Sequence, residues 1–202
     1  MILINIFFYA LGAYIALTTL YLFFLTVAAW FFNKETTPAH TLSPATIVIP
    51  AHNEALGIAQ TLDSIKRTNF PRDQYCMVVI ADNCEDDTAA VARQAGATVL
   101  ERSDTLNRGK GQALDWFFKT HPDQYAQRDA VVIIDADTLV PPRFFLEICH
   151  SLSQPSVQVV QGFYGVSNPE VNWRTALSAA ALCVFHHIRP AGRNVIHATA
   201  GL

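Results

Sequence analysis

Two acidic side chains, Asp135 and Asp137, are the clearest candidates for chemistry in this sequence. They follow directly on the apolar run 131–134. Two carboxylates at positions i and i+2, where a buried strand breaks into a loop, reach toward the same space and offer the hard oxygen ligands that Mg²⁺ or Mn²⁺ prefers. Such an ion bridges the two phosphates of a nucleoside diphosphate and neutralises that leaving group. The alternative is a pair of solvated turn aspartates.

Asp82 and Lys110 stand at comparable positions. Asp82 ends another apolar run and can accept hydrogen bonds from the N–H groups of a nucleobase. Lys110 lies between Gly109 and Gly111, which let the backbone approach a ligand while the ammonium reaches a phosphate. The alternatives are a turn residue at Asp82 and a flexible surface loop around Lys110. No Walker pattern accompanies the lysine.

Short β-branched runs that alternate with helical patterns must position these side chains. The expected strands cover residues 46–49, 77–80, 98–100 and 131–134, and a further strand is expected at 157–161. The expected helices cover residues 56–68, 88–96, 111–119 and 143–152. Strands that are apolar throughout are typical of a parallel sheet covered by helices on both faces. The sequence therefore predicts an α/β fold with a mainly parallel sheet, whose ligand sits beyond the carboxyl ends of the strands.

The N-terminal segment is a different kind of element. Residues 2–32 carry no charge, and at about 1.5 Å per residue they exceed the roughly 30 Å hydrocarbon core of a bilayer. We expect a transmembrane anchor over residues 1–32, a linker over 33–44 and one domain over 45–202. The alternatives are a signal peptide and a buried core helix. The basic residues beyond the anchor favour a domain that faces the cytosol: Lys34, Lys66, Arg67 and Arg72.

Composition excludes several classes of function. The formal net charge of -3 and the lack of a basic run argue against a nucleic-acid partner. The four cysteines show no C-x-x-C spacing, so neither a zinc site nor a disulfide framework is indicated. The apolar helical pattern at 177–188 is too short to span a bilayer and indicates a core or membrane-surface helix.

Four motifs occur together and in order: TIVIPAHNE at 46–54, ADNCEDDT at 81–88, RGKGQAL at 108–114 and DAD at 135–137. With them the chain resembles the family 2 inverting glycosyltransferases over residues 45 to about 161. The resemblance implies the GT-A fold, a Rossmann-like nucleotide-binding sheet, a nucleotide-sugar donor, most simply a UDP-sugar, and a glycan or lipid acceptor.

The same resemblance implies roles for single residues. Asp82 would contact the base, Asp135 the ribose or sugar side, and Asp137 the metal, with Asp135 as a second metal ligand. Gln161 would lie near the donor or the acceptor. The full set expected around the nucleotide-sugar is Pro50, Ala51, Asn53, Glu54, Asp82, Asn83, Lys110, Asp135 and Gln161.

The catalytic base is the part of the family pattern that the chain does not show. An inverting enzyme needs a base that deprotonates the acceptor hydroxyl, and the resemblance implies an Asp or Glu after a glycine-rich segment. Glu147 falls in an expected helix and Glu170 in an expected loop, so neither suits that role. We therefore expect a donor-binding part of an active site, truncated at the C-terminus, with its general base outside these residues.

Two other functions compete with sugar transfer. A nucleotidyltransferase uses a similar sheet and paired aspartates, but it needs a glycine- and arginine-containing loop where this chain has residues 51–54. A non-catalytic module that binds a nucleotide-sugar is the second alternative, and the expected lack of a base is its main support.

Overall fold

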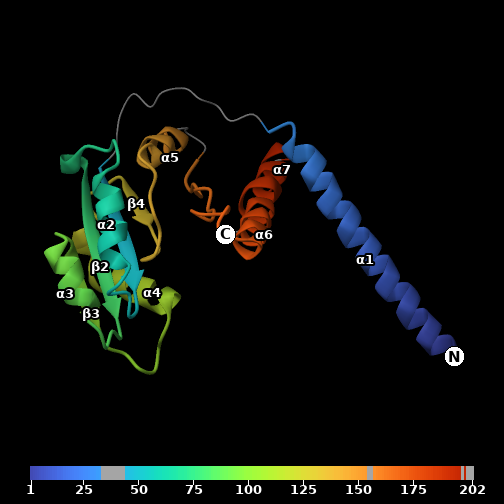
Figure 1. The fold of residues 1–202 in the computed structure, drawn as a ribbon, viewed down its shortest axis with the longest axis horizontal. Coiled ribbons are helices and arrows are strands. Elements are labelled where there is room, and N and C mark those ends of the chain that lie inside the picture. The colour runs from blue at the N-terminus through green and yellow to red at the C-terminus, as the bar shows by residue number, and fades with distance from the viewer. Residues whose placement is uncertain (33–43, 154–156, 197, 199–202) are drawn as a thin grey trace. The chain divides into compact units, whose positions relative to one another are not determined.

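The structure is a computed structural model that describes residues 1–32, 44–153, 157–196 and 198. The chain forms two compact units (Figure 1). One consists of Met1–Thr36 with Gln161–Leu202, and the other is Thr37–Val160. The predicted boundaries of anchor, linker and domain stay a prediction, and most of the linker lies outside the described residues.

The second unit is built on a four-stranded parallel sheet. Its strands are β1 (Ala45–Ala51), β2 (Tyr75–Asp82), β3 (Thr98–Arg102) and β4 (Ala130–Ile133), in the order β3-β2-β1-β4. Val48 of β1 pairs with Val78 on one side and Ile133 on the other. The parallel sheet and its four strands are confirmed, although β1, β2 and β3 each continue two residues beyond the predicted end.

Helices cover both faces of this sheet. They are α2 (Ile58–Lys66), α3 (Thr88–Gln94), α4 (Lys110–Thr120) and α5 (Phe144–Leu152), with short 3₁₀ turns at Arg72–Gln74 and Pro122–Gln124. Successive strand side chains point to opposite faces, so Ile47 and Ile49 share a core with α2, α3 and α5. Val48 packs on the other face against Phe117 of α4. The two central strands, β1 and β2, are thus buried on both sides, as their apolar sequences predict, whereas the outer strands are partly exposed.

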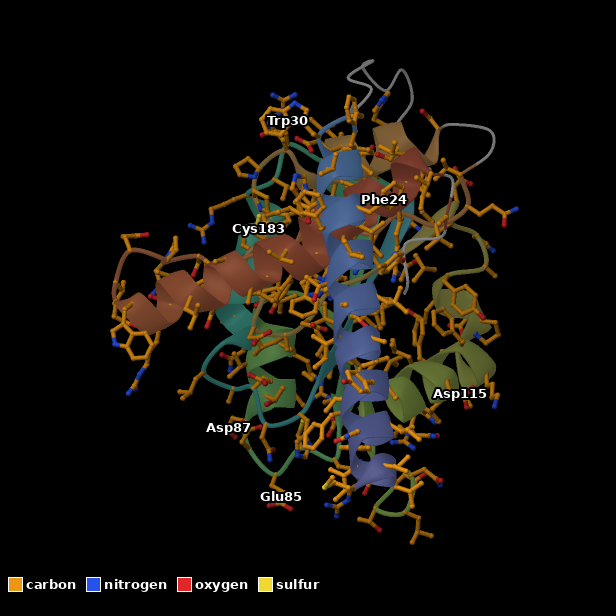
Figure 2. The ribbon with its side chains drawn as sticks, turned by 90° about the vertical axis from the view of Figure 1, so that its right-hand side faces the viewer. Phe24, Trp30, Glu85, Asp87, Asp115 and Cys183 are labelled. Carbon is orange, nitrogen blue, oxygen red and sulfur yellow. The ribbon has the colours of Figure 1, made fainter. Side chains whose placement is uncertain are left out.

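Glycines and an acidic turn fix the ends of two of these helices. Gly96, with φ +77°, follows α3, and Gly109, with φ +106°, precedes α4. Side chains other than glycine rarely adopt these angles. At the start of α3, Asp86 accepts a hydrogen bond from the backbone N–H of Thr88 at 3.0 Å. Figure 2 shows Glu85 and Asp87 projecting outward from this turn.

The first unit joins the N-terminal helix to helices from the C-terminal part of the chain. Helix α1 (Ile2–Ala29) is the one described helix that is long and apolar enough to cross a membrane. A continuous helical stretch packs against its C-terminal end (Figure 2). This stretch comprises α6 (Trp173–Cys183), a π-helical segment (Val184–Ile188) and α7 (Arg189–Val195). The contact is close, because a Cβ on Gly192 would lie 2.2 Å from the carbonyl oxygen of Leu25.

One expected strand is absent from the structure. Residues 157–161 form no strand in the part of the chain that the structure describes. Their mixture of valine and glutamine suits a strand locally, but strand formation depends on a neighbouring strand with which to pair. The described strands leave β4 as the outer strand of the sheet on that side.

Candidate functional site

The order of the strands defines where a ligand fits. The chain runs from β1 through β2 to β3 on one side and then crosses to β4 on the other side of β1. In open parallel sheets, the crevice beyond the carboxyl ends of the strands at such a reversal is the usual binding site. In this chain the reversal lies between the end of β1 and the end of β4. The motif at 50–54 and the Asp135-Ala-Asp137 motif follow these two strands.

A cleft of about 270 Å³ opens at this edge of the sheet. Its size is near the lower end of the roughly 300–1,000 Å³ that is typical of small-molecule sites. Residues from the ends of β1 and β2 and from the start of α4 line it: Pro50, Ala51, His52, Asp82, Asn83, Arg108, Gly109, Lys110 and Ala113. Five of the residues predicted from the sequence are therefore brought together, namely Pro50, Ala51, Asp82, Asn83 and Lys110.

Asp82 is held firmly at the floor of the cleft. The Arg102 guanidinium donates from Nη1 to Asp82 Oδ1 at 2.6 Å, and Asn83 Nδ2 donates to the same oxygen at 3.0 Å. The Arg102 and Asp82 side chains are only 5% and 8% exposed. Among the described residues Asp82 Oδ2 accepts no hydrogen bond, so this oxygen is available to a ligand.

The loop between β3 and α4 is organised around a second carboxylate. Asp104 Oδ1 accepts hydrogen bonds at 3.0 Å from the backbone N–H groups of Leu106 and Asn107. These bonds, with one from the Asn107 side chain, lower the pKa of Asp104. Arg102 Nη2 donates to Asp104 Oδ2 at 2.9 Å and to the Asn107 carbonyl at 2.8 Å. Arg102 therefore joins the Asp82 site to the loop that leads into Lys110.

Asn53 and Glu54 lie on the loop after β1 but do not line the cleft. The Asn53 side chain accepts a hydrogen bond from the Glu85 backbone N–H at 2.8 Å, and its φ of 55° is left-handed. The Glu54 backbone N–H donates to Thr88 Oγ1 at 2.8 Å. Burial raises the pKa of the Cys84 thiol between these loops. The role of Asn53 and Glu54 in nucleotide binding stays a prediction.

Asp135 and Asp137 lie where the chain leaves β4. The Lys110 ammonium forms an ion pair with Asp135 Oδ1, which places this carboxylate beside the cleft. Between the two acids, the buried Ala136 turns inward and its carbonyl accepts a hydrogen bond from Thr61 at 2.6 Å. Asp137 is exposed. Because Ala136 is anchored to α2, the backbone between the two carboxylates is fixed.

Gln161 belongs to the other compact unit and lies in a coil segment. Its predicted place near the donor or the acceptor stays a prediction.

Three residues of the site were missed or given no role by sequence reasoning. His52 and Arg108 line the cleft, and His52 Nδ1 donates a hydrogen bond to the Asp82 carbonyl at 2.8 Å. Arg102 does not line the cleft but contacts Asp82 from behind. The signal that could have found Arg102 is its place as the last residue of β3, which a longer strand prediction would have put at the carboxyl edge.

Curated relatives and solved structures resemble this chain. A 4,4'-diaponeurosporenoate glycosyltransferase of Staphylococcus aureus (strain MRSA252) is 36% identical over 96 residues, which is 46% of this chain and 23% of the relative. The same enzyme of strain USA300 matches with the same identity and coverage. The chain thus spans about a quarter of the length of these curated relatives.

Two solved structures share its fold. The mannosyltransferase PcManGT from Pyrobaculum calidifontis, in complex with GDP-Man and Mn²⁺, superposes with a TM-score of 0.57 and 26% identity, covering 80% of this chain and 48% of that one. Glucosyl-3-phosphoglycerate synthase of Mycobacterium tuberculosis gives a TM-score of 0.50 and 27% identity over 71% of this chain and 56% of that one. The expected GT-A fold is thereby confirmed.

A family model described as "Glycosyltransferase like family 2" matches residues 43–195. The match begins just before β1 and ends with α7, so it includes the whole sheet and every residue of the cleft. With the parallel sheet, the strand-end cleft and glycosyltransferases as structural neighbours, this match shows that the chain belongs to glycosyltransferase family 2.

Proposed function

We propose that this protein transfers a sugar from a nucleotide-sugar to a glycan or lipid acceptor, and that the cleft at the edge of the sheet grips the donor with the help of a divalent metal ion. One observation carries the proposal. Motifs that are separated by up to 85 positions, from Pro50 to Asp135, converge beyond the carboxyl ends of the strands at the point where strand order reverses.

Asp82 would bind the base. It lies on the floor of the cleft with Oδ2 available, and a carboxylate oxygen is a strong acceptor for a ring N–H. Asn83 and Ala51 would enclose the nucleoside at the ends of β2 and β1. The donor is a nucleoside diphosphate sugar, and UDP is the nucleotide that the family resemblance favours.

The start of α4 would hold the diphosphate. Lys110 and the N-terminal backbone N–H groups of this 11-residue helix border the cleft, and both attract anions. Gly109 lines the cleft at φ +106°, which lets the backbone pass close to a phosphate. Arg108 adds a second cationic side chain at the same place.

Asp135 and Asp137 would hold the metal ion. No group of three or more His, Cys, Asp or Glu suited to a metal occurs among residues 1–32, 44–153 and 157–196. Two carboxylates nevertheless fit Mg²⁺ or Mn²⁺, which proteins often bind through one or two carboxylates while substrate phosphates and water complete the shell. The ion, when bound, would neutralise charge on the leaving nucleoside diphosphate. The Mn²⁺ and GDP-Man in the PcManGT complex support the proposal that this chain also binds its donor with a divalent metal ion.

The ion pair between Lys110 and Asp135 suits this arrangement. Both side chains are about half exposed, at 53% and 44%, and such a pair contributes about 0–1 kcal/mol. Little is lost when Lys110 turns to a phosphate and Asp135 to a cation. The two charges neutralise each other without the ligand and would become separate binding groups when the donor binds.

Helix α1 would anchor the protein in a membrane, with the sheet domain facing the cytosol. The helix has 28 residues and carries no charged side chain, which exceeds the roughly 20 residues that a bilayer requires. A membrane anchor would keep the site close to a lipid or growing glycan acceptor.

The test measures binding and turnover separately on the full chain. Binding of UDP and GDP is followed by calorimetry with and without Mn²⁺, and sugar transfer is followed with membrane extract as the acceptor. We expect binding by the natural chain and at least a tenfold loss in Asp82→Ala, because a hydrogen bond to a charged group contributes about tenfold or more in affinity. Binding without transfer would support the donor-binding module instead. Absence of any nucleotide binding would contradict the proposal.

A further inference from the structure

Arg102 is a nearly buried cation that the proposed binding site does not touch directly. Its side chain is 5% exposed, and its two terminal nitrogens contact three acceptors: Asp82 Oδ1, Asp104 Oδ2 and the Asn107 carbonyl. An ion pair this deep costs desolvation free energy and is weak evidence for a purely stabilising role. Because Arg102 connects two parts of the cleft, a role in shaping the binding site accounts better for its burial.

We propose that Arg102 is the positioning residue of the base subsite, and that it makes the site selective for nucleoside diphosphates whose base carries a ring N–H. This inference rests on the proposed function and adds the class of base. Arg102 and Asn83 both donate to Asp82 Oδ1. The carboxylate is thereby fixed in rotation, and Oδ2 is the oxygen that remains for the ligand.

A fixed carboxylate oxygen discriminates among bases through their ring nitrogens. Uracil carries N3–H and guanine carries N1–H, and each can donate to Asp82 Oδ2. Cytosine and adenine present a lone pair at the corresponding nitrogen, which would face the negative oxygen. A site built to accept a hydrogen bond rejects a ligand that lacks the donor far more strongly than a site that only packs against it. The expected donors are therefore uracil or guanine nucleotides.

Asn83 shows that the geometry is set from more than one side. Its φ of 51° is left-handed, and its side-chain oxygen accepts the Asp104 backbone N–H at 2.8 Å while its Nδ2 donates to Asp82. Arg102 and Asn83 thus both tie Asp82 to the loop at 103–109. Rotation of Asp82 would break bonds in that loop as well as its own.

A matched control is Arg93 of α3, which pairs with a residue on the same strand as Arg102. Arg93 forms an ion pair with Glu101, the neighbour of Arg102 on β3, but this pair is exposed, at 51% and 62%. It has no contact with Asp82 or with the loop at 103–109 among the interactions of the described residues. Replacement of Arg93 removes an arginine of the same chemistry without touching the cleft.

The experiment compares UDP with CDP as probes, because the two differ only at the base. Their affinities are measured by calorimetry for the natural chain, Arg102→Met, Arg102→Lys and Arg93→Met, with thermal unfolding as a check of folding. The natural chain should prefer UDP by about 10- to 100-fold, the range expected for a hydrogen bond to a charged group. In Arg102→Met the preference should fall to about threefold or less. Arg93→Met should keep it.

The ratio of affinities separates positioning from a structural role. If Arg102→Met weakens UDP and CDP equally, or keeps the natural preference, Arg102 does not position Asp82 and the inference is wrong. If Arg102→Met fails to fold, Arg102→Lys provides the same test, because one ammonium group cannot replace both terminal nitrogens of the guanidinium. In Arg102→Lys the preference for UDP over CDP must then fall at least about threefold. Failure of the natural chain to bind any nucleotide would instead overturn the proposed function.

Discussion

Asp135 and Asp137 have different surroundings although only Ala136 separates them. Asp135 is paired with Lys110 at the border of the cleft, whereas Asp137 is exposed. The buried Ala136 carbonyl is tied to Thr61 of α2. Asp137 can therefore be replaced without disturbing packing, and it is the cleaner position at which to test the metal.

Asp137→Ala should remove the metal-dependent part of nucleotide binding and leave the fold intact. The side chain is exposed, so its loss creates no cavity, but one of the two proposed metal ligands disappears. Calorimetry of UDP binding with and without Mn²⁺ gives the comparison. Asp115→Ala is the control, because Asp115 lies on the exposed face of α4 and pairs with Lys119 (Figure 2). A Mn²⁺ effect that survives in Asp137→Ala would remove this residue from the metal site.

The loop at 103–109 gives a pH dependence at the scale of a single element. Hydrogen bonds from Asn107 and Leu106 lower the pKa of Asp104. A carboxyl group with a lowered folded-state pKa stabilises the fold above its unfolded pKa of about 3.9, and this contribution is lost as the pH falls through the folded value. Asp104→Asn should therefore unfold at a lower temperature than the natural chain at neutral pH.

The difference in unfolding temperature between the natural chain and Asp104→Asn should itself change with pH. It should stay constant from about pH 7 to pH 5 and shrink below about pH 4, as the natural Asp104 becomes protonated. Thermal unfolding measured across this range provides the comparison. A difference that is the same at every pH would mean that the charge of Asp104 contributes nothing.

The contact between α1 and α7 depends on a glycine. A Cβ at position 192 would lie 2.2 Å from the Leu25 carbonyl oxygen, so the backbone must shift in Gly192→Ala. Overpacking of this kind costs about 1–3 kcal/mol. We expect limited proteolysis to cut the helical stretch at 173–195 faster in this variant. Gly12→Ala is the control, since nothing lies within 4 Å of a Cβ at Gly12. Equal cleavage of the two variants would show that the contact does not hold these helices together.

The secondary-structure elements differ in how clearly the sequence predicts them. The four strands of the sheet could be predicted because each contains a short apolar run, and the rule that ligands lie beyond carboxyl ends then selected Asp82, Lys110 and Asp135. Arg102 was missed because a charged residue after an apolar run usually indicates that the strand has ended at an exposed position. In the structure the Arg102 side chain is instead buried in an ion pair with Asp82 of the neighbouring strand. The expected strand at 157–161 was wrong because a short run of valine and glutamine does not indicate whether a pairing strand is available.

At the scale of the whole molecule, α1 is the element that we propose as a membrane anchor. It carries no charged side chain, and its predominantly apolar side chains are mostly exposed within the chain, which suits lipid rather than water. We expect the full chain to stay with membranes after an alkaline carbonate wash and to retain Met1 when analysed by mass spectrometry. Recovery of a soluble chain that lacks α1 would favour a cleaved signal sequence. In sealed inside-out vesicles, added protease should digest the sheet domain; protection would contradict the cytosolic orientation.

Family membership, the GT-A fold and the strand-end cleft together lead to the claim that the carboxyl edge of the sheet binds the donor nucleotide. Hydrogen–deuterium exchange of the full chain, with and without UDP and Mn²⁺, tests this most directly. Exchange should slow in the segments that follow the strands, at residues 50–54, 82–84, 108–111 and 135–137. It should stay unchanged in α5, whose Phe145 packs against Tyr75 at the amino end of β2. Protection confined to other segments, or none at saturating UDP, would contradict it.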